Sequence, residues 1–148
     1  RQGEIQRMSA WTGVLHSERN PSETEPVHLL QIWIFPETKG IEPGYEQKLF
    51  AGSLKVDVPL AIATPEGGGA AVRIHQDVRV SVLRFGKTGG RTDLPIAPGR
   101  RAWLQVVAGS LQVNGTALSA GDGAAVEKET KLAFKADEAS EALVFDLP

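Results

Sequence analysis

The sequence predicts an all-β protein. Short runs rich in branched and aromatic residues recur along the chain, turn-forming residues separate them, and helical periodicity is nearly absent. The runs follow one another at intervals of roughly eight to twelve residues, a spacing typical of a sandwich or barrel. A chain of 148 residues can bury a core as one ordinary domain, or as one small domain plus part of another.

The first strongly apolar run is "VHLLQIWIF", Val27–Phe35. Its density of large apolar side chains predicts a strand that is buried on both faces. A shorter run, "EIQRMSA", precedes it near the start of the chain and is a further strand candidate of the same unit. Proline-bearing stretches that are long for a compact module surround these runs.

Three later runs are also expected to be strands, and a hairpin lies between two of them. The strands are expected at Arg79–Phe85, Ala102–Gly109 and Ala142–Leu147. The hairpin is "SLQVNGTAL", Ser110–Leu118, in which Asn114 and Gly115 can both take the positive φ that a two-residue turn requires.

The composition of the chain changes at "TPEGGGAAV", Thr64–Val72. Three consecutive glycines after Pro-Glu indicate a flexible connector. The sequence therefore predicts a partial first unit over residues 1–63, a connector over 64–71 and a complete small β-barrel over 72–148.

Composition excludes several kinds of function. The net charge is −2 with scattered Lys and Arg, so binding of nucleic acid through its phosphates is disfavoured, and a solvated turn is the preferred interpretation of Gly99–Arg101. The absence of cysteine excludes disulfides and thiolate metal sites. Uninterrupted apolar runs, such as Leu60–Ala63, are too short to span a bilayer, and without a charged leader we expect a cytoplasmic protein.

The stretch "TGVLHSERN" sets His16 and Glu18 two residues apart, just after Gly13. In a strand such residues point to the same face about 7 Å apart, and Gly13 allows a bend that could aim them inward. An imidazole and a carboxylate suit iron, manganese, nickel or zinc. A site needs at least three protein ligands, however, and an exposed histidine beside a surface glutamate is the alternative interpretation.

The other two histidines are expected to be structural. His28 alternates with Leu30 and Ile32, which predicts a hydrogen-bonded residue packed on the core side. His75 alternates with Arg73 and Asp77, which predicts a surface position. Two copies of the chain could also join two His16/Glu18 pairs into one four-ligand site.

The segment "MSAWTGVLHSERNPSETEPVHLLQIWIFPE" resembles the pirin family of two-cupin proteins. Gly13, His16 and Asn20 match the spacing of the second cupin motif, and the resemblance continues through "GIEPGYEQKLF", "VRIHQD", "LQVVAGSLQVNG" and "VFDLP". It implies a cupin fold, a double-stranded β-helix or jelly-roll barrel, here as one partial and one complete unit. It also implies one metal, usually iron, held by three histidines and a glutamate, of which His16 and Glu18 match two. The other two form an H-x-H that this sequence lacks.

The resemblance implies an activity as well. Some pirins cleave the flavonol quercetin oxidatively, and others are transcriptional cofactors that bind a regulatory protein. In the dioxygenases the glutamate can accept the substrate's hydroxyl proton, a general-base role that Glu18 would inherit. Trp11 stands where the family usually has glycine, which indicates an altered fragment or a tolerated surface aromatic.

Our expectation for the chain as given is a truncated pirin-like protein without bound metal or catalysis. The alternative is an iron-dependent flavonol dioxygenase, or a transcriptional cofactor, in a longer parent. The metal-ligand positions of the second cupin hold Ile96, Pro98, Ala102 and Ala124, so that unit should be metal-free. An incomplete first barrel exposes a strand edge, which predicts a homo-oligomer, by strand exchange or similar self-association, or packing of the orphan strands onto the second unit.

Overall fold

The computed structural model describes residues 2–10 and 13–148, so Trp11 lies outside the described residues. Its one described helical element is a 3-10 turn, Ala51–Ser53, and the rest consists of strands, turns and extended loops. The all-β prediction is confirmed.

Twelve strands occur in the described residues. They are β1 (Glu4–Ser9), β2 (Gly44–Leu49), β3 (Leu60–Thr64), β4 (Val72–Arg73), β5 (Arg79–Phe85), β6 (Arg91–Pro95), β7 (Arg101–Ala108), β8 (Ser110–Val113), β9 (Thr116–Ser119), β10 (Gly123–Val126), β11 (Lys131–Ala136) and β12 (Ser140–Leu147). The expected strands at β5, β7 and β12 are confirmed.

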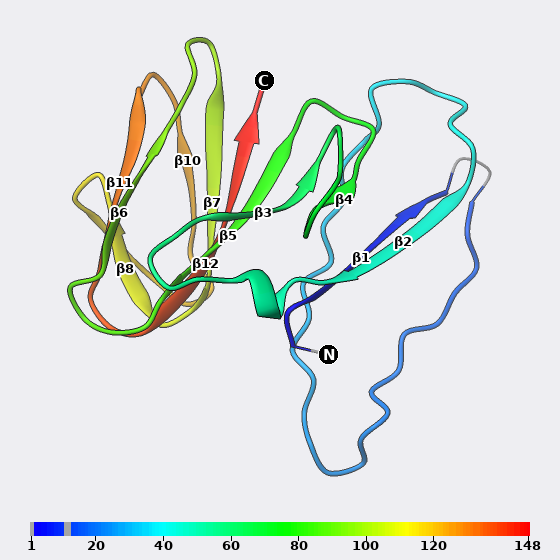
Figure 1. Cartoon of the computed structure of the whole chain (residues 1–148), viewed down its shortest axis with the longest axis horizontal. Helices are drawn as coiled ribbons and strands as arrows, with labels where there is room; N and C mark the ends of the chain where they lie inside the picture. Colours follow the sequence, from blue (N-terminus) through cyan, green and yellow to red (C-terminus); the bar gives the residue numbers. More distant parts are fainter. Residues whose placement is uncertain (1, 11–12) are drawn as a thin grey trace.

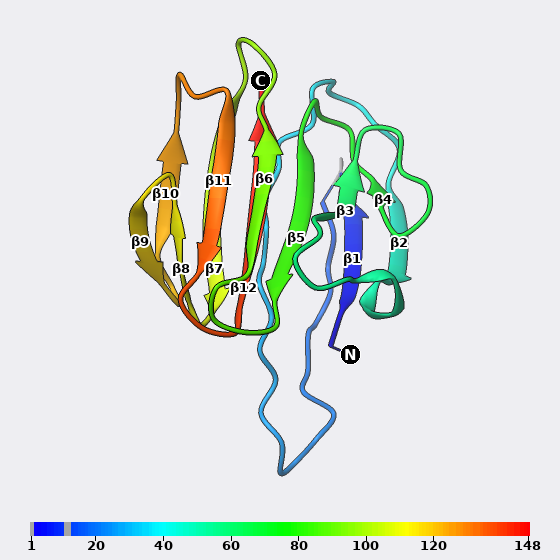
Figure 2. The same ribbon diagram turned by 60° about the vertical axis from the view of Figure 1, so that its left-hand side comes forward.

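The strands form three sheets. A six-stranded sheet has the order β10-β7-β12-β5-β3-β4, a four-stranded sheet has the order β6-β11-β8-β9, and β1 and β2 form a two-stranded sheet. The two larger sheets face each other and form the barrel (Figures 1 and 2). The strands β1 and β2 lie beside β4, at the end of the six-stranded sheet.

Two hydrophobic clusters cover the two faces of the six-stranded sheet. The first lies between the two large sheets and includes Phe85, Leu104 and Val144. The second includes Val82 and Leu143, which are register partners in β5 and β12. Each lies next to a first-cluster residue along its own strand, so its side chain points to the opposite face of the sheet. Burial on both faces explains why adjacent residues are buried together in these strands, Val82 and Leu83 in β5 and Ala142–Val144 in β12.

The predicted hairpin is confirmed. β8 and β9 pair antiparallel, and the turn between them holds Asn114 at φ 48° and Gly115 at φ 83°. Asn114 is also fixed by its own side chain, since its Oδ1 accepts a hydrogen bond from Ala133 N at 2.7 Å. The turn chemistry that the sequence displays therefore sets the register of this pair.

The β1–β2 sheet is attached to β4 by polar contacts. Arg7 Nε donates to the Arg73 carbonyl at 3.0 Å, and Glu46 Oε2 accepts the Arg73 N–H at 2.9 Å. Ile5 packs against the second cluster from the same side. The division into units at residues 63 and 72 stays a prediction; in the structure β3 and β4, on either side of residues 64–71, are parallel neighbours in one sheet.

Glu46 is expected to make stability depend on pH. The Arg73 N–H holds the pKa of this carboxyl below its ordinary value of 4.5, and Lys48 and Arg7 act in the same direction. A carboxyl whose pKa is lower in the folded state than in the unfolded state stabilises the fold at pH values above its ordinary pKa. This stabilisation is lost as the pH falls through the pKa of the folded state. Glu46→Gln should therefore cost about 1 kcal/mol at neutral pH and much less near pH 3. Urea unfolding at both pH values measures this.

Glu66→Gln is the matched control, because the Glu66–Arg79 ion pair is exposed on both sides. Exposed ion pairs contribute little, so this variant should match the wild type at both pH values. An equal loss from Glu46→Gln at neutral and acid pH would contradict the assignment to the carboxylate charge.

The expected strand at Val27–Phe35 is wrong. The segment is extended but pairs with no strand among the described residues, and its side chains are exposed apart from Ile34, which packs on the second cluster. A strand needs a cross-strand partner as well as β propensity, and none is present here. His28, expected on the core side, is exposed for the same reason.

Candidate functional site

His16 and Glu18 both lie on one long excursion of the chain. Residues 13–36, here called the arm, leave the end of β1 and project well beyond the sheets before returning (Figures 1 and 2). Gly13 begins the arm at φ 97°, the left-handed region that favours glycine, and its N–H donates to the Ala10 carbonyl at 3.1 Å. The bend expected at Gly13 is thus present, but His16 and Glu18 are exposed.

The Glu18 carboxylate is held by the other leg of the arm. Gln31 Nε2 donates to Glu18 Oε2 at 2.7 Å, across 13 positions of sequence. This bond leaves the second carboxylate oxygen available to another donor or to a cation. Gln31 has no obvious role in the sequence alone, because only the fold of the arm brings it to Glu18.

Asn20, the last residue of the motif, organises the tip of the arm. Its Oδ1 accepts the Ser22 N–H at 3.2 Å and its Nδ2 donates to the Glu25 carbonyl at 2.6 Å. Ser22 Oγ accepts the Glu25 N–H at 2.9 Å. These bonds turn the chain through its proline-bearing tip, so Asn20 has a structural role here.

The described residues do not assemble a complete metal site. Within residues 2–10 and 13–148, no group of three or more His, Cys, Asp or Glu side chains lies close enough together to hold an ion. His28 is exposed on the arm, and His75 is half-buried beyond β4, where its carbonyl accepts the Glu37 N–H at 2.8 Å. Two donors do not fit the three or more that a transition-metal site requires.

The barrel interior is apolar where a cupin would place metal ligands. Ile96 and Ala102 are buried in the first cluster, and Ala124 packs against it. Pro98 lines a pocket of about 340 Å³ at one end of the barrel, together with Arg100. These positions supply no side-chain donor to a cation.

Arg100 ties the start of β7 to its surroundings. Its Nη1 donates to Asp77 Oδ2 at 2.9 Å and its Nε to Asp146 Oδ1 at 2.5 Å. These two carboxylates raise the pKa of the guanidinium above its ordinary value. Arg100 is therefore engaged within the fold rather than in a free solvated turn, and it is not available to clamp a phosphate.

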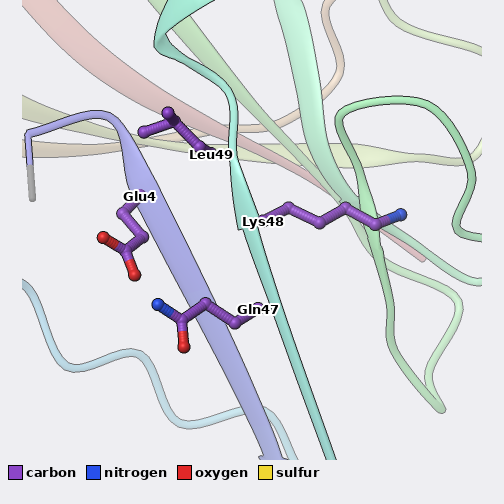
Figure 3. A pocket seen from close by; sticks show the side chains of 4 residues that line it. All are labelled: Glu4, Gln47, Lys48 and Leu49. Carbon is purple, nitrogen blue, oxygen red and sulfur yellow. The ribbon is translucent and has the colours of Figure 1, made fainter.

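A second hollow, of about 460 Å³, lies on the β1–β2 sheet. Glu4, Gln47, Lys48 and Leu49 line it, and Figure 3 shows Glu4 and Gln47 on one side of the sheet while Lys48 points away from them. Lys48 Nζ donates to the Ala71 carbonyl at 2.5 Å, which accounts for its direction. Neither His16 nor Glu18 lines this hollow.

No helix in the described part of the chain has the length and apolarity to cross a membrane.

Known proteins match the chain along its whole length. The family described as the quercetinase C-terminal cupin domain matches residues 61–147, and the family described as pirin matches residues 1–34. The quercetin 2,3-dioxygenase of Escherichia coli strain K12 is 42% identical over 149 residues, which cover 99% of this chain and 62% of that protein. A pirin-like protein of Caulobacter vibrioides is 33% identical over 97% of this chain.

Solved structures of related proteins have the same fold as this chain. The crystal structure of the bacterial pirin YhhW from Escherichia coli, in complex with nickel(II), is similar with a TM-score of 0.88 and 43% identity, covering 99% of this chain and 62% of that one. The chain thus spans less than two thirds of the length of these relatives. The predicted resemblance and the cupin fold are confirmed, and the chain belongs to the pirin family.

Proposed function

We propose that His16 and Glu18 are two of the metal donors of a quercetin 2,3-dioxygenase-type centre, and that one copy of these 148 residues holds too few donors to form it. The observation that carries the proposal is their position on the arm, two residues apart, with Glu18 oriented by Gln31 at 2.7 Å. A relative named quercetin 2,3-dioxygenase and a nickel(II)-bound relative support it. Iron is the metal that the family resemblance implies, and the same donors suit nickel(II).

Glu18 is the residue that we assign to proton transfer. Its carboxylate can accept the proton of a flavonol hydroxyl, and the Gln31 amide keeps one of its oxygens occupied while the other stays open. His16, exposed on the same leg of the arm, can offer an imidazole nitrogen. The remaining donors must come from another polypeptide segment, so we propose that the single copy binds metal weakly and does not turn over quercetin.

Metal titration tests this assignment. The purified chain, titrated with nickel(II) in a calorimeter and analysed for metal after dialysis, should retain far less than one equivalent. His16→Ala should lower the residual affinity by at least about tenfold, the size of effect that even outer-shell changes produce at complete sites. His75→Ala is the control, because His75 lies away from the arm.

Two results would contradict the proposal. One is stoichiometric nickel(II) that survives dialysis in a monomeric chain, since a single copy would then supply every donor. The other is residual affinity that is unchanged by His16→Ala but lost in His75→Ala.

A second candidate function is binding to another protein. The observation that favours it is the uncharged apolar stretch Val27–Phe35, which is exposed on the arm. We propose this role for the chain as given, in place of catalysis. A regulatory protein is the partner that the family resemblance implies, and quercetin turnover by the purified chain would argue for the enzyme instead.

A further inference from the structure

The side-chain amide of Asn114 bonds to β11 through both of its polar atoms. Its Oδ1 accepts the Ala133 N–H at 2.7 Å, and its Nδ2 donates to the Lys131 carbonyl at 3.1 Å. The Asn114 N–H also donates to the Ala133 carbonyl at 3.0 Å. The pairing of β8 with β11 ends at Val113, so Asn114 continues it by one position with side-chain groups in place of backbone groups.

The residue that follows Asn114 makes this asparagine chemically labile. In an Asn-Gly sequence the backbone nitrogen of the glycine can attack the side-chain carbon Cγ of the asparagine, because no Cβ hinders its approach. The new C–N bond closes a five-membered succinimide ring, and the side-chain nitrogen leaves as ammonia. Water then opens the ring at either carbonyl and leaves aspartate or isoaspartate, so water is the co-reactant.

In the folded hairpin the attacking atom is free and the group that it would attack is held. No hydrogen bond from the Gly115 N–H is present among the described residues, and both Asn114 and Gly115 are exposed to water. The amide, in contrast, must leave Lys131 and Ala133 before its carbon can meet the Gly115 nitrogen. We propose that Asn114–Gly115 is a deamidation site that β11 keeps closed, and that it reacts when the hairpin separates from β11.

The sequence allows this reaction to be followed without ambiguity. The chain contains one other asparagine, Asn20, and Pro21 follows it. A proline nitrogen carries no hydrogen, so it cannot close the ring. Asp122–Gly123 can form the same ring by losing water, but its reopening gives an isomer of unchanged mass. A gain in mass at an asparagine therefore reports Asn114.

Neither product can take the place of Asn114 against β11. Aspartate keeps an acceptor for the Ala133 N–H, but it turns a carboxylate oxygen toward the Lys131 carbonyl where Nδ2 had donated. Isoaspartate adds a carbon to the main chain of a two-residue turn, which breaks the register that this turn sets. A hairpin that has opened and reacted should therefore not pair with β11 as before.

Peptide mapping by mass spectrometry of the full chain, incubated at neutral pH, tests the proposal. Replacement of the amide NH2 by OH raises the mass of the peptide that contains Asn114. The hydrogen bonds to β11 should slow this gain at least about tenfold in the folded chain relative to the same chain in urea. The readout is a covalent change in the barrel, so its failure leaves the proposed metal chemistry untouched.

Leu132→Ala tests whether β11 controls the reaction. Leu132 has no exposed surface and lies between the two β11 residues that bind the amide, so its truncation should loosen β11 and speed the mass gain several-fold. Leu49→Ala removes the same atoms from a side chain that is 60% exposed, and it should react like the wild type. Circular dichroism checks that both variants keep their strands. If Leu132→Ala does not fold, the comparison of folded and urea-unfolded wild type decides the outcome.

Three results would overturn the proposal. Equal rates in the folded chain and in urea would show that the bonds to β11 hold nothing back. An Asn114 amide that persists in urea would show that the site is not reactive. A folded Leu132→Ala chain that deamidates no faster than Leu49→Ala would show that β11 does not control the reaction.

Asn114→Asp reproduces one product and tests its effect on the fold. This variant should melt at a lower temperature than the wild type, because it loses the donor to the Lys131 carbonyl. Gln6→Glu makes the same conversion at an exposed side chain of β1 and should melt like the wild type. Equal melting temperatures for all three chains would contradict the loss of pairing that we assign to the product.

Discussion

Leu104→Ala is expected to destabilise the protein by about 2–5 kcal/mol. Leu104 has no exposed surface and lies in the first cluster, at the centre of β7, opposite Val144 of β12 and Ala124 of β10. Neighbours that are fixed by two hydrogen-bonded ladders cannot collapse into the space that the shorter side chain leaves. The total free energy of unfolding of a small domain is about 5–15 kcal/mol, so the substitution should remove a large part of the stability.

Urea unfolding monitored by circular dichroism measures this loss as a lower midpoint at constant slope. Leu49→Ala is the matched control, because Leu49 is 60% exposed and the same atoms are removed. Its effect should stay within about 0.5 kcal/mol. Equal losses from both variants would contradict the assignment of Leu104 to the barrel core.

Gly109→Ala is expected to be similarly costly, at about 2–5 kcal/mol. Gly109 joins β7 to β8 at φ 71°, which an L side chain rarely adopts. A Cβ built there would lie 2.2 Å from the Ala139 carbonyl oxygen and 2.8 Å from Ser140 Cβ. The substitution therefore combines backbone strain with a contact that only a shift of the main chain can relieve.

Gly121→Ala separates these two causes. Gly121 has φ 93°, but a Cβ there would meet nothing within 4 Å. It should cost only the strain, about 1–2 kcal/mol. Thermal unfolding of the two variants side by side measures the difference, and equal melting temperatures would show that the close approach at Gly109 is unimportant.

Local sequence patterns predicted the strands that carry their own signal. β5, β7, β12 and the β8–β9 hairpin were found from branched residues and from Asn114-Gly115. β11, in "KLAFKA", was missed, although Leu132, Phe134 and Ala136 alternate into the core. β6 is an edge strand with a polar sequence, "RTDLP", and among the described strands it pairs with β11. Such a strand is specified by its partner, which local propensity does not reveal.

The sequence predicts which residues belong to the candidate site, but not how they are arranged in space. His16 and Glu18 stand out by type and spacing, and Gly13, where a bend was expected, has φ 97°. The bond from Gln31 to Glu18 joins two legs of the arm, so no local pattern could indicate it. Val27–Phe35 was assigned as a buried strand because composition reports how apolar a segment is, without reporting whether a neighbour exists to cover it.

The sharing of β5 and β12 by both hydrophobic clusters has a consequence for folding. Loss of the second cluster would expose one face of the same strands whose other face lines the barrel. The two clusters therefore cannot unfold independently. The body should behave as a single cooperative unit, while the arm can open and close locally without disturbing it. Substitutions at the exposed positions of the arm should therefore cost the body little stability, so the constraint on His16 and Glu18 would come from the proposed metal centre and not from folding.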